Sequence, residues 1–309
     1  MYRYIIKRLL MLVPVILGVI FIILFIMDIA PGDPVYMVAG EQATEEELQE
    51  IRKELGLDGN LATRYVRYVG NMLKGDLGTS YISKRDVMKT YIERLPNTLK
   101  LALLTMVVAI AMSVPLGIVA AVNQNKPKDT ISMVLALLGL SMPNFWLGLL
   151  LILVFSLKLG WLPSGGNTGF KSIILPAVTV GTGLAALMTR TTRSSMLDVI
   201  RQDYLRTARS KGVSERKVIR KHALKNALIP IITVFGIQFS NVLGGSVLAE
   251  TVFSWPGVGR LIVDAINNRD IPTVTGAIVM TTILVSIVNL IVDIVYAFID
   301  PRIKAQYTK

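Results

Sequence analysis

The sequence contains no cysteine and a single histidine, His222, among its 309 residues. Without cysteine, the chain cannot form a disulfide framework, hold an iron–sulfur cluster through thiolates or use a thiol nucleophile. With one histidine, a zinc or haem site built from protein side chains is not expected. Charged residues are also scarce, at 17% of the chain against 52% hydrophobic residues. Because soluble domains carry about a quarter charged residues, this composition disfavours a soluble protein.

The motifs of nucleotide-dependent enzymes are missing as well. The pattern G-x-x-x-x-G-K-[ST] does not occur, so the chain has no phosphate-binding loop, and no Ser/His/Asp or paired-carboxylate pattern stands out. Gly181–Ala186 (GTGLAA) matches the dinucleotide fingerprint, but it lies in an apolar run with no strand before it. Close helix packing at small residues is the better interpretation. We therefore predict no enzymatic activity, no metal and no cofactor bound by this chain.

Long apolar segments are what the sequence does contain. Leu9–Met27 is nineteen residues without a charge, which is long enough to cross a bilayer and longer than the core of a cleaved signal peptide. Five further runs qualify as membrane spans: Leu101–Val122, Ile131–Leu157 (interrupted by Pro143-Asn144), Ile173–Thr189, Ala227–Phe253 and Thr273–Ile299. The sequence predicts an all-α, polytopic membrane protein with six transmembrane helices.

Positive charge is unequally distributed between the segments that join these spans. Four segments are basic: the N-terminal tail, the loop with Lys126 and Lys128, residues 190–225, and the tail with Arg302, Lys304 and Lys309. Residues 30–94 instead hold eleven acids and nine bases. Since cytoplasmic loops are enriched in lysine and arginine, both termini and the 190–225 segment are predicted to face the cytoplasm.

The 30–94 segment is long enough to fold on its own. Thr44 and Glu47 form a capping box, and the helix after them ends at Gly56. A second amphipathic helix is predicted over Leu61–Lys74. This pattern indicates a small extracytoplasmic cap, which either docks a specific partner or is a loop without one.

Several polar residues lie inside the predicted spans. For Asn289 and Asp293 the favoured interpretation is interhelical hydrogen bonding, whereas three others are candidates for a translocation path. Asn144 follows the helix-breaking Pro143, and Gln238 and Asn241 are three residues apart on one helix face. Such side chains either line a translocation path or join helices by hydrogen bonds, and the sequence leaves both interpretations open.

The most basic stretch runs from residue 190 to 225 and holds eleven lysines and arginines against three acids. Asp203 can cap a short helix over Tyr204–Lys211, Gly212 can supply its left-handed exit, and Ser214 can cap the next helix. A DNA-binding helix-turn-helix is disfavoured, because membrane spans tether both ends of the stretch and would keep it out of a major groove. Control of membrane topology and contact with anionic lipids both suit the charge, but neither requires two capped helices.

The order and spacing of several motifs resemble a known family. They are LLMLVPVILGVIF…IAPGDP (9–34), LGLD (55–58), GDLGTSY (75–81), RLPNTLKLAL (94–103), SMPNFWLGLLL (141–151), LGWLPSGG (159–166), ETVFSWPGVGRL (250–261) and DPRI (300–303). Together they cover nearly the whole chain. The sequence is similar to permease subunits of ATP-binding-cassette (ABC) importers, and among these to the first (B-type) permease of the peptide/nickel group.

This resemblance implies a type I importer permease fold. Its parts would be a tail and first helix (1–30), the extracytoplasmic cap (31–94) and a five-helix core (95–309) with a cytoplasmic coupling loop (190–228). It further implies a prokaryotic plasma membrane, a second homologous permease, two cytoplasmic ATPase subunits that bind the ATP, and an extracytoplasmic binding protein, but no nucleic acid.

The family docks its ATPase with a loop of the pattern E-A-A-x-x-x-G, and Arg206-Thr207-Ala208-x-x-x-Gly212 occupies that frame here. The glutamate and first alanine are replaced, as in the peptide/nickel group. The residues implied in ATPase coupling are Tyr204, Thr207, Ala208, Arg209, Lys211 and Gly212.

The implied substrates are di- and oligopeptides, and relatives of similar sequence carry nickel chelates, glutathione or oligosaccharides. The alternative of another class is an ion-coupled secondary transporter. It would predict an inverted repeat and charged residues at the middle of the membrane, and neither is evident.

Overall fold

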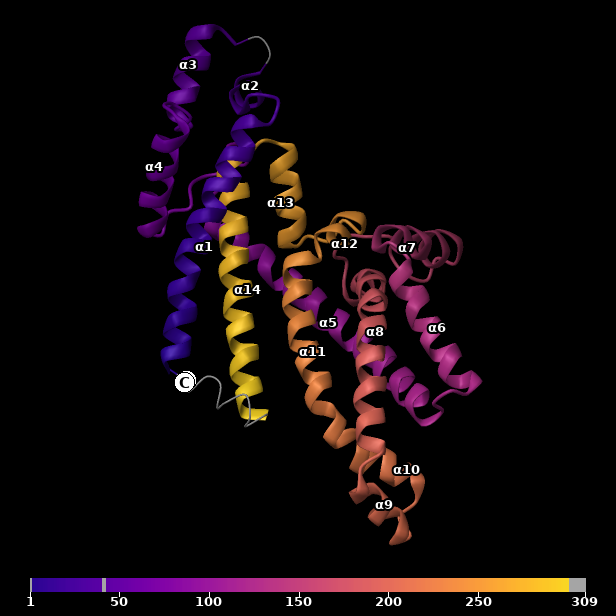
Figure 1. The fold of residues 1–309 in the computed structure, drawn as a ribbon. Coiled ribbons are helices and arrows are strands. Elements are labelled where there is room, and N and C mark those ends of the chain that lie inside the picture. The colour runs from indigo at the N-terminus through magenta and orange to yellow at the C-terminus, as the bar shows by residue number, and fades with distance from the viewer. Residues whose placement is uncertain (1, 41–42, 300–309) are drawn as a thin grey trace. The chain divides into compact units, whose positions relative to one another are not determined.

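The computed structural model describes residues 2–40 and 43–299. The tail with Arg302, Lys304 and Lys309, which was predicted to face the cytoplasm, lies outside the described residues. Over the described residues the chain is helical, and the one β-type contact is an isolated bridge between Thr79 and Asp86. The helices are α1 (Tyr2–Ile29), α2 (Pro34–Ala39), α3 (Glu45–Glu54), α4 (Leu61–Leu73), α5 (Val87–Val122), α6 (Pro127–Ser141), α7 (Asn144–Leu151), the π-helix η1 (Ile152–Lys158), α8 (Phe170–Ile200), α9 (Asp203–Ser210), α10 (Glu215–Lys217), the π-helix η2 (Val218–Ala223), α11 (Leu224–Gly245), α12 (Val247–Val252), α13 (Val258–Asn267) and α14 (Ile271–Ile299). The predicted all-α class is confirmed (Figure 1).

Five helical segments among the described residues are long and apolar enough to cross a membrane, and a bent pair of helices makes a sixth if the pair counts as one span. The pair consists of α6 and the α7–η1 segment, which meet at an angle of 97° around Met142-Pro143. The predicted interruption of Ile131–Leu157 at Pro143-Asn144 is therefore confirmed. Proline lacks the amide donor and forces the residue before it into an extended backbone, and Met142 has ψ 123°.

The chain forms two compact units. The first comprises the residues up to Thr98 together with Pro256–Val288, and the second comprises Leu99–Trp255 with the end of α14. Helices α5 and α14 contribute to both units. The predicted division into 1–30, 31–94 and 95–309 follows position along the chain and stays a prediction.

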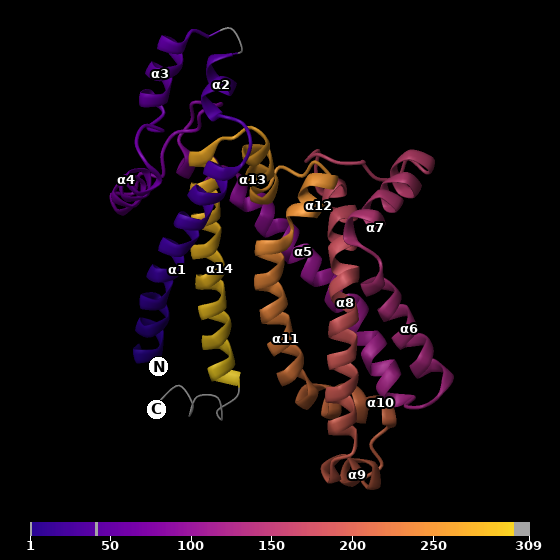
Figure 2. The same ribbon diagram turned by 45° about the horizontal axis from the view of Figure 1, so that its top comes forward.

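In the first unit, α4 lies beside α1 (Figure 2), and α3 and α4 of the cap begin as the sequence predicted, whereas α2 was not predicted. The Thr44–Glu47 capping box is present, and Gly56 follows α3 with a left-handed φ of 65°. Tyr65 and Tyr68 of α4 pack against a buried cluster that includes Ile20 of α1. The amphipathic face of α4 thus attaches the cap to the first span.

Helix α13 was not predicted. It carries Val258, Leu261, Ile262 and Ala265 at helical spacing, a periodic pattern that could have revealed it. Its first residue is anchored within the same unit, because the Val258 amide donates to Thr98 Oγ1 over 2.8 Å.

In the second unit, α8 packs against α6, α7 and α11 (Figure 2). The GTGLAA segment lies on α8 as a packing surface, which confirms its interpretation. A β-carbon on Gly181 would lie 2.9 Å from Val108 Cγ1 of α5, and one on Gly183 would lie 3.0 Å from Asn144 Oδ1 of α7. The side chain of Thr182, between them, occupies the space left by Gly139 of α6.

Candidate functional site

The short helix predicted to dock a partner is present as α9, beyond the end of α8 (Figure 1). It begins at Asp203, so Gln202 is the N-cap residue and its side chain makes no capping hydrogen bond. The predicted Asp203 cap is therefore wrong by one residue. Asp203 lies in the first turn instead, where the positive end of the helix dipole stabilises its negative carboxylate.

The exit from α9 matches the prediction. Gly212 has φ 76°, its amide donates to the Arg209 carbonyl over 2.9 Å, and the Val213 amide donates to the Ala208 carbonyl over 3.2 Å. This is the Schellman arrangement, which needs a residue in the left-handed region. Glycine adopts that region without the steric cost of a β-carbon.

The next helix begins after Ser214, as expected, but the serine side chain makes no capping hydrogen bond. Helices α10, η2 and α11 then follow without a break and form one 31-residue segment, Glu215–Gly245. Residues of η2 complete a wide π-type turn at the root of this segment. The sequence contained no clear signal for that turn.

The inner face of α9 is apolar and buried. Leu205 is fully buried in a cluster with Met196 of α8 and with Val218 and Ala223 of η2. Ala208 is half-buried against the same cluster. Helix α9 is therefore attached to both long helices that flank it, and is not a free loop.

Hydrogen bonds add a second attachment between α9 and the root of α11. Asn226 Nδ2 donates to Tyr204 Oη over 2.6 Å, and the Tyr204 hydroxyl donates to the His222 carbonyl over 3.4 Å. Asn226 Nδ2 also donates to that carbonyl over 3.3 Å. The single histidine of the chain thus takes part through its backbone.

An ion pair closes the turn after α9. Arg209 Nε and Nη2 each donate over 2.9 Å to the carboxylate of Glu215, at the start of α10. This bidentate contact raises the pKa of the Arg209 guanidinium, so the pair stays charged. Bidentate arginine–carboxylate pairs have a defined orientation, and this one holds the start of α10 against α9.

The six residues implied in coupling therefore divide into two groups. Ala208 and Arg209 are half-buried and make intramolecular contacts, whereas Tyr204, Thr207, Lys211 and Gly212 are exposed. Arg206 and Ser210, which were not among the six, are exposed on α9 as well. The accessible surface of α9 combines a tyrosine ring, hydroxyl groups and positive charge, which suits a groove on another protein.

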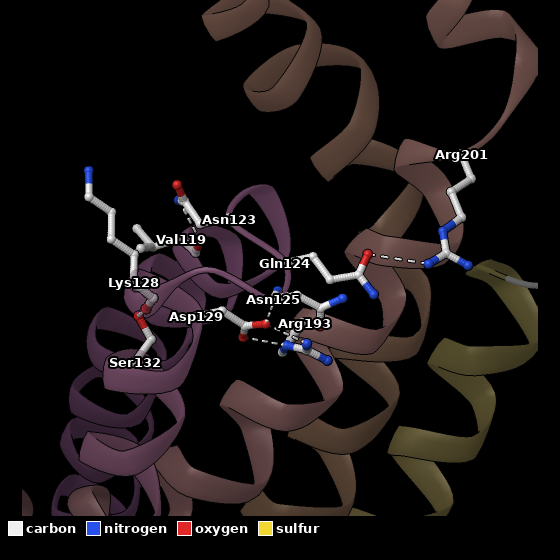
Figure 3. A network of polar contacts seen from close by, with 9 residues as sticks. All are labelled: Val119, Asn123, Gln124, Asn125, Lys128, Asp129, Ser132, Arg193 and Arg201. Atoms are coloured by element: carbon white, nitrogen blue, oxygen red, sulfur yellow. Dashed lines mark hydrogen bonds and ion pairs between the residues drawn. The ribbon is translucent and has the colours of Figure 1, made fainter.

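A polar network connects the turn between α5 and α6 to the last part of α8 (Figure 3). Arg193 of α8 donates from Nε and Nη2 to the two carboxylate oxygens of Asp129, both over 2.7 Å. The backbone amide of Asn125 donates to Oδ2 of the same carboxylate over 3.0 Å. Arg201 Nη2, at the end of α8, donates to Gln124 Oε1 over 3.2 Å.

The Asp129 side chain in this network is only 7% exposed, so its partners decide whether its burial is tolerated. The sequence alone did not predict this pair. Asp129 and Arg193 are 64 residues apart in the sequence, and neither charged residue by itself indicates which residue it pairs with.

The three polar residues assigned to the spans are not all brought together. Gln238 and Asn241 lie side by side on α11, where Asn241 Nδ2 donates to Gln238 Oε1 over 3.0 Å. Asn144 lies at the start of α7 and faces Gly183 of α8. Whether these residues line a path stays a prediction.

The geometry suits mechanical transmission more than chemistry. Among the described residues, no group of three or more histidine, cysteine, aspartate or glutamate side chains could hold a metal ion. The site consists of a short, partly exposed helix that lies between two long helices. Apolar packing, hydrogen bonds and the Arg209–Glu215 ion pair hold it there.

Comparisons with known proteins agree with this geometry. Residues 113–305 match the family described as binding-protein-dependent transport system inner membrane component, and residues 1–102 match the N-terminal domain of membrane components of such systems. The glutathione transport system permease protein GsiC of Salmonella paratyphi A is 43% identical over 304 residues, covering 98% of this chain and 99% of that protein. GsiC of Escherichia coli (strain K12) has the same identity and coverage.

Solved structures with similar folds come from ABC transporters. A chain of the MetNI methionine ABC transporter in an inward-facing conformation matches with a TM-score of 0.58 and 17% identity, over 69% of this chain and 97% of that chain. A chain of an amino acid ABC transporter matches with a TM-score of 0.53 and 15% identity, over 68% and 94%. At these identities the likeness concerns the fold alone.

Proposed function

Because the chain belongs to the inner membrane components of binding-protein-dependent transport systems, as a permease subunit of an ABC importer, we propose that it carries di- and oligopeptides into the cell. Glutathione, nickel chelates and oligosaccharides are the alternative substrates within the same architecture. Among these, the names of the GsiC relatives favour glutathione, which is itself a tripeptide. The family leaves no place for an ion-coupled secondary transporter.

The observation that carries the proposed mechanism is the attachment of α9 to two long helices at once. Leu205 is buried against α8 and η2, and Tyr204 is hydrogen-bonded to the root of α11. When ATPase subunits close on ATP, a force on α9 would move both helices together. Such rigid-body motion fits alternating access.

The ion pair of Asp129 and Arg193 extends this path to α6. Arg193 lies on α8, ten residues before α9 begins, and Asp129 lies in the first turn of α6. A movement of the end of α8 would therefore also act on the helix that leads to the bend at Pro143.

The proposal includes the partners that such a subunit needs. They are a second homologous permease, two cytoplasmic ATPases and an extracytoplasmic binding protein, in a prokaryotic plasma membrane with both termini of this chain inside. The lack of a phosphate-binding loop supports separate ATPases, and the basic loops support the orientation.

Substitution of Gly212 by proline tests the coupling assignment. Proline requires φ near −65°, whereas Gly212 has φ 76°, so α9 would lose its exit geometry. We expect the Gly212→Pro chain to insert into the membrane and to lose ATPase co-purification, or substrate-stimulated ATP hydrolysis, by at least about tenfold. The readouts are the yield of complex and the rate of ATP hydrolysis.

Gly75→Pro is a matched control. Gly75 has φ 85°, and its backbone amide donates to the Met72 carbonyl over 2.9 Å, the same three-residue spacing as the hydrogen bond of Gly212. Gly75 lies in the cap, away from α9 in the sequence. The control should assemble with its ATPases normally. A Gly212→Pro complex with normal substrate-stimulated hydrolysis would show that α9 is not the coupling element.

Uptake by the reconstituted importer tests the substrate. With its binding protein present, we expect a labelled tripeptide to be taken up in an ATP-dependent way, and unlabelled glutathione and dipeptides to compete. If only a nickel chelate or an oligosaccharide were taken up, the peptide assignment would be wrong although the coupling assignment could stand.

A further inference from the structure

A cleft lies between the last three turns of α5 and the start of the α10–α11 segment. We call it the α5–η2 cleft, and it has a volume of about 390 Å³. Its lining is made by Val114, Pro115, Ile118, Val119 and Val122 of α5 and by Glu215, Arg216, Ile219 and Arg220. In both ribbon views the end of α5 lies beside α10 (Figures 1 and 2).

The α5 wall of this cleft is wholly apolar. Its residues lie on one face of the helix, and Val119 and Val122 are 41% and 44% exposed. Because α5 is one of the segments suited to cross a membrane, this wall belongs at the level of the hydrocarbon. An apolar surface there fits an acyl chain.

The opposite wall carries two positive charges without acidic partners. Arg216 and Arg220 are exposed, and among the described residues neither side chain makes a hydrogen bond or ion pair. The neighbouring acid, Glu215, is engaged by Arg209. Like charges four residues apart on a helix repel each other, so an anion between them would be favourable.

We propose that the α5–η2 cleft binds one acidic phospholipid, with its acyl chain along α5 and its phosphate between Arg216 and Arg220. Basic pockets between transmembrane helices are suited to acidic lipid headgroups. Free phosphate would leave the apolar wall uncovered, and a neutral lipid would leave the arginines uncompensated. The lipid would lie against η2, the turn that packs against the proposed coupling helix α9. Binding of the lipid does not depend on the proposed peptide substrate.

Lipid binding to the full chain tests the proposal. The chain is purified in a neutral detergent, stripped of lipid and titrated with dioleoyl phosphatidylglycerol or dioleoyl phosphatidylcholine, and bound lipid is counted by native mass spectrometry. We expect one phosphatidylglycerol to bind preferentially. The double variant Arg216→Gln/Arg220→Gln should bind it about 25-fold more weakly, the effect of two basic contacts.

The double variant Lys217→Gln/Lys221→Gln is the matched control. It removes the same charge at the same spacing from the same segment, but neither lysine lines the cleft. It should keep the preference for phosphatidylglycerol. Val119→Trp, which fills the cleft and keeps both arginines, should lose it, and inorganic phosphate should not displace the lipid.

Three results would overturn the proposal. The first is equal affinity of the unchanged chain for the two lipids. The second is an equal loss in the arginine and lysine double variants, which would indicate a diffuse electrostatic effect. The third is an arginine double variant that keeps lipid binding and loses ATPase co-purification, which would assign this surface to the ATPase.

Discussion

At the scale of residues, glycines decide how closely other helices approach α8. Gly181 faces α5, Gly183 faces α7, and Gly139 of α6 leaves room for Thr182. Gly117 of α5 is tighter still, since a β-carbon there would lie 2.5 Å from Thr192 Cβ. The sequence predicted small-residue packing for GTGLAA. It could not name the partner helices, because a small residue shows that something is close without showing what.

Gly181→Val should therefore destabilise the second unit. The added side chain would meet Val108 Cγ1 and the Thr105 carbonyl, and overpacking of this kind costs about 1–3 kcal/mol. The measurement is the unfolding temperature in detergent. Gly18→Ala on α1 is the control, because nothing lies within 4 Å of a β-carbon there, and it should leave the temperature unchanged or raised. Equal effects of the two changes would contradict the packing account.

At the scale of elements, a shared polar network joins the turn between α5 and α6 to the end of α8. The carboxylate of Asp129 receives two donors from Arg193 and one from the Asn125 backbone. Asn125 reaches that position with φ 60°, in the left-handed region that asparagine tolerates better than most residues. This backbone conformation directs the backbone amide of Asn125 toward the carboxylate of Asp129.

Breaking this pair should weaken both stability and coupling. We expect Asp129→Asn or Arg193→Leu to cost roughly 2–3 kcal/mol, less than for a fully buried pair, because the Arg193 side chain is 26% exposed. The exchange Asp129→Arg/Arg193→Asp should recover part of that loss. The ATP hydrolysed per substrate imported is the second readout. If the single variants lost stability but kept this ratio, the pair would be structural only.

Elements also show where prediction from the sequence succeeds and fails. Hydropathy located each apolar run, but the helices have other limits. The run predicted from Leu101 lies in a helix that begins at Val87, and the run predicted over Ala227–Phe253 is divided, because α11 ends at Gly245 and α12 follows. The polar turns before Leu101 continue the helix outside the apolar window, where hydropathy gives no signal. Pro143 marked the interruption of the third span, yet the 97° bend depends on packing against α8 that no local pattern contains.

At the scale of the whole molecule, the orientation in the membrane rests on the charge of the loops. The segments with Lys126, Lys128 and the eleven lysines and arginines of 190–225 lie within the described residues, and their placement inside the cell is a prediction. The native sequence offers a clean background for testing it, because it has no cysteine that could react.

Single cysteines should therefore report the topology directly. Ser83→Cys in the cap and Lys211→Cys beside α9 both replace exposed residues. A maleimide that cannot cross the membrane should label Ser83→Cys in intact cells or spheroplasts, and Lys211→Cys only after the membrane is opened. Labelling of both from outside would contradict the predicted orientation.

The wide turn of η2 lies between α9 and the long helix α11. A π-type turn holds more residues than an α-helical turn, and η2 spans Val218–Ala223. Without one of its residues this turn could rewind as an ordinary α-helical turn, which holds fewer residues for the same rotation. A change of one residue in the length of η2 can thus be absorbed by the winding of the helix, with little change in the orientation of α9.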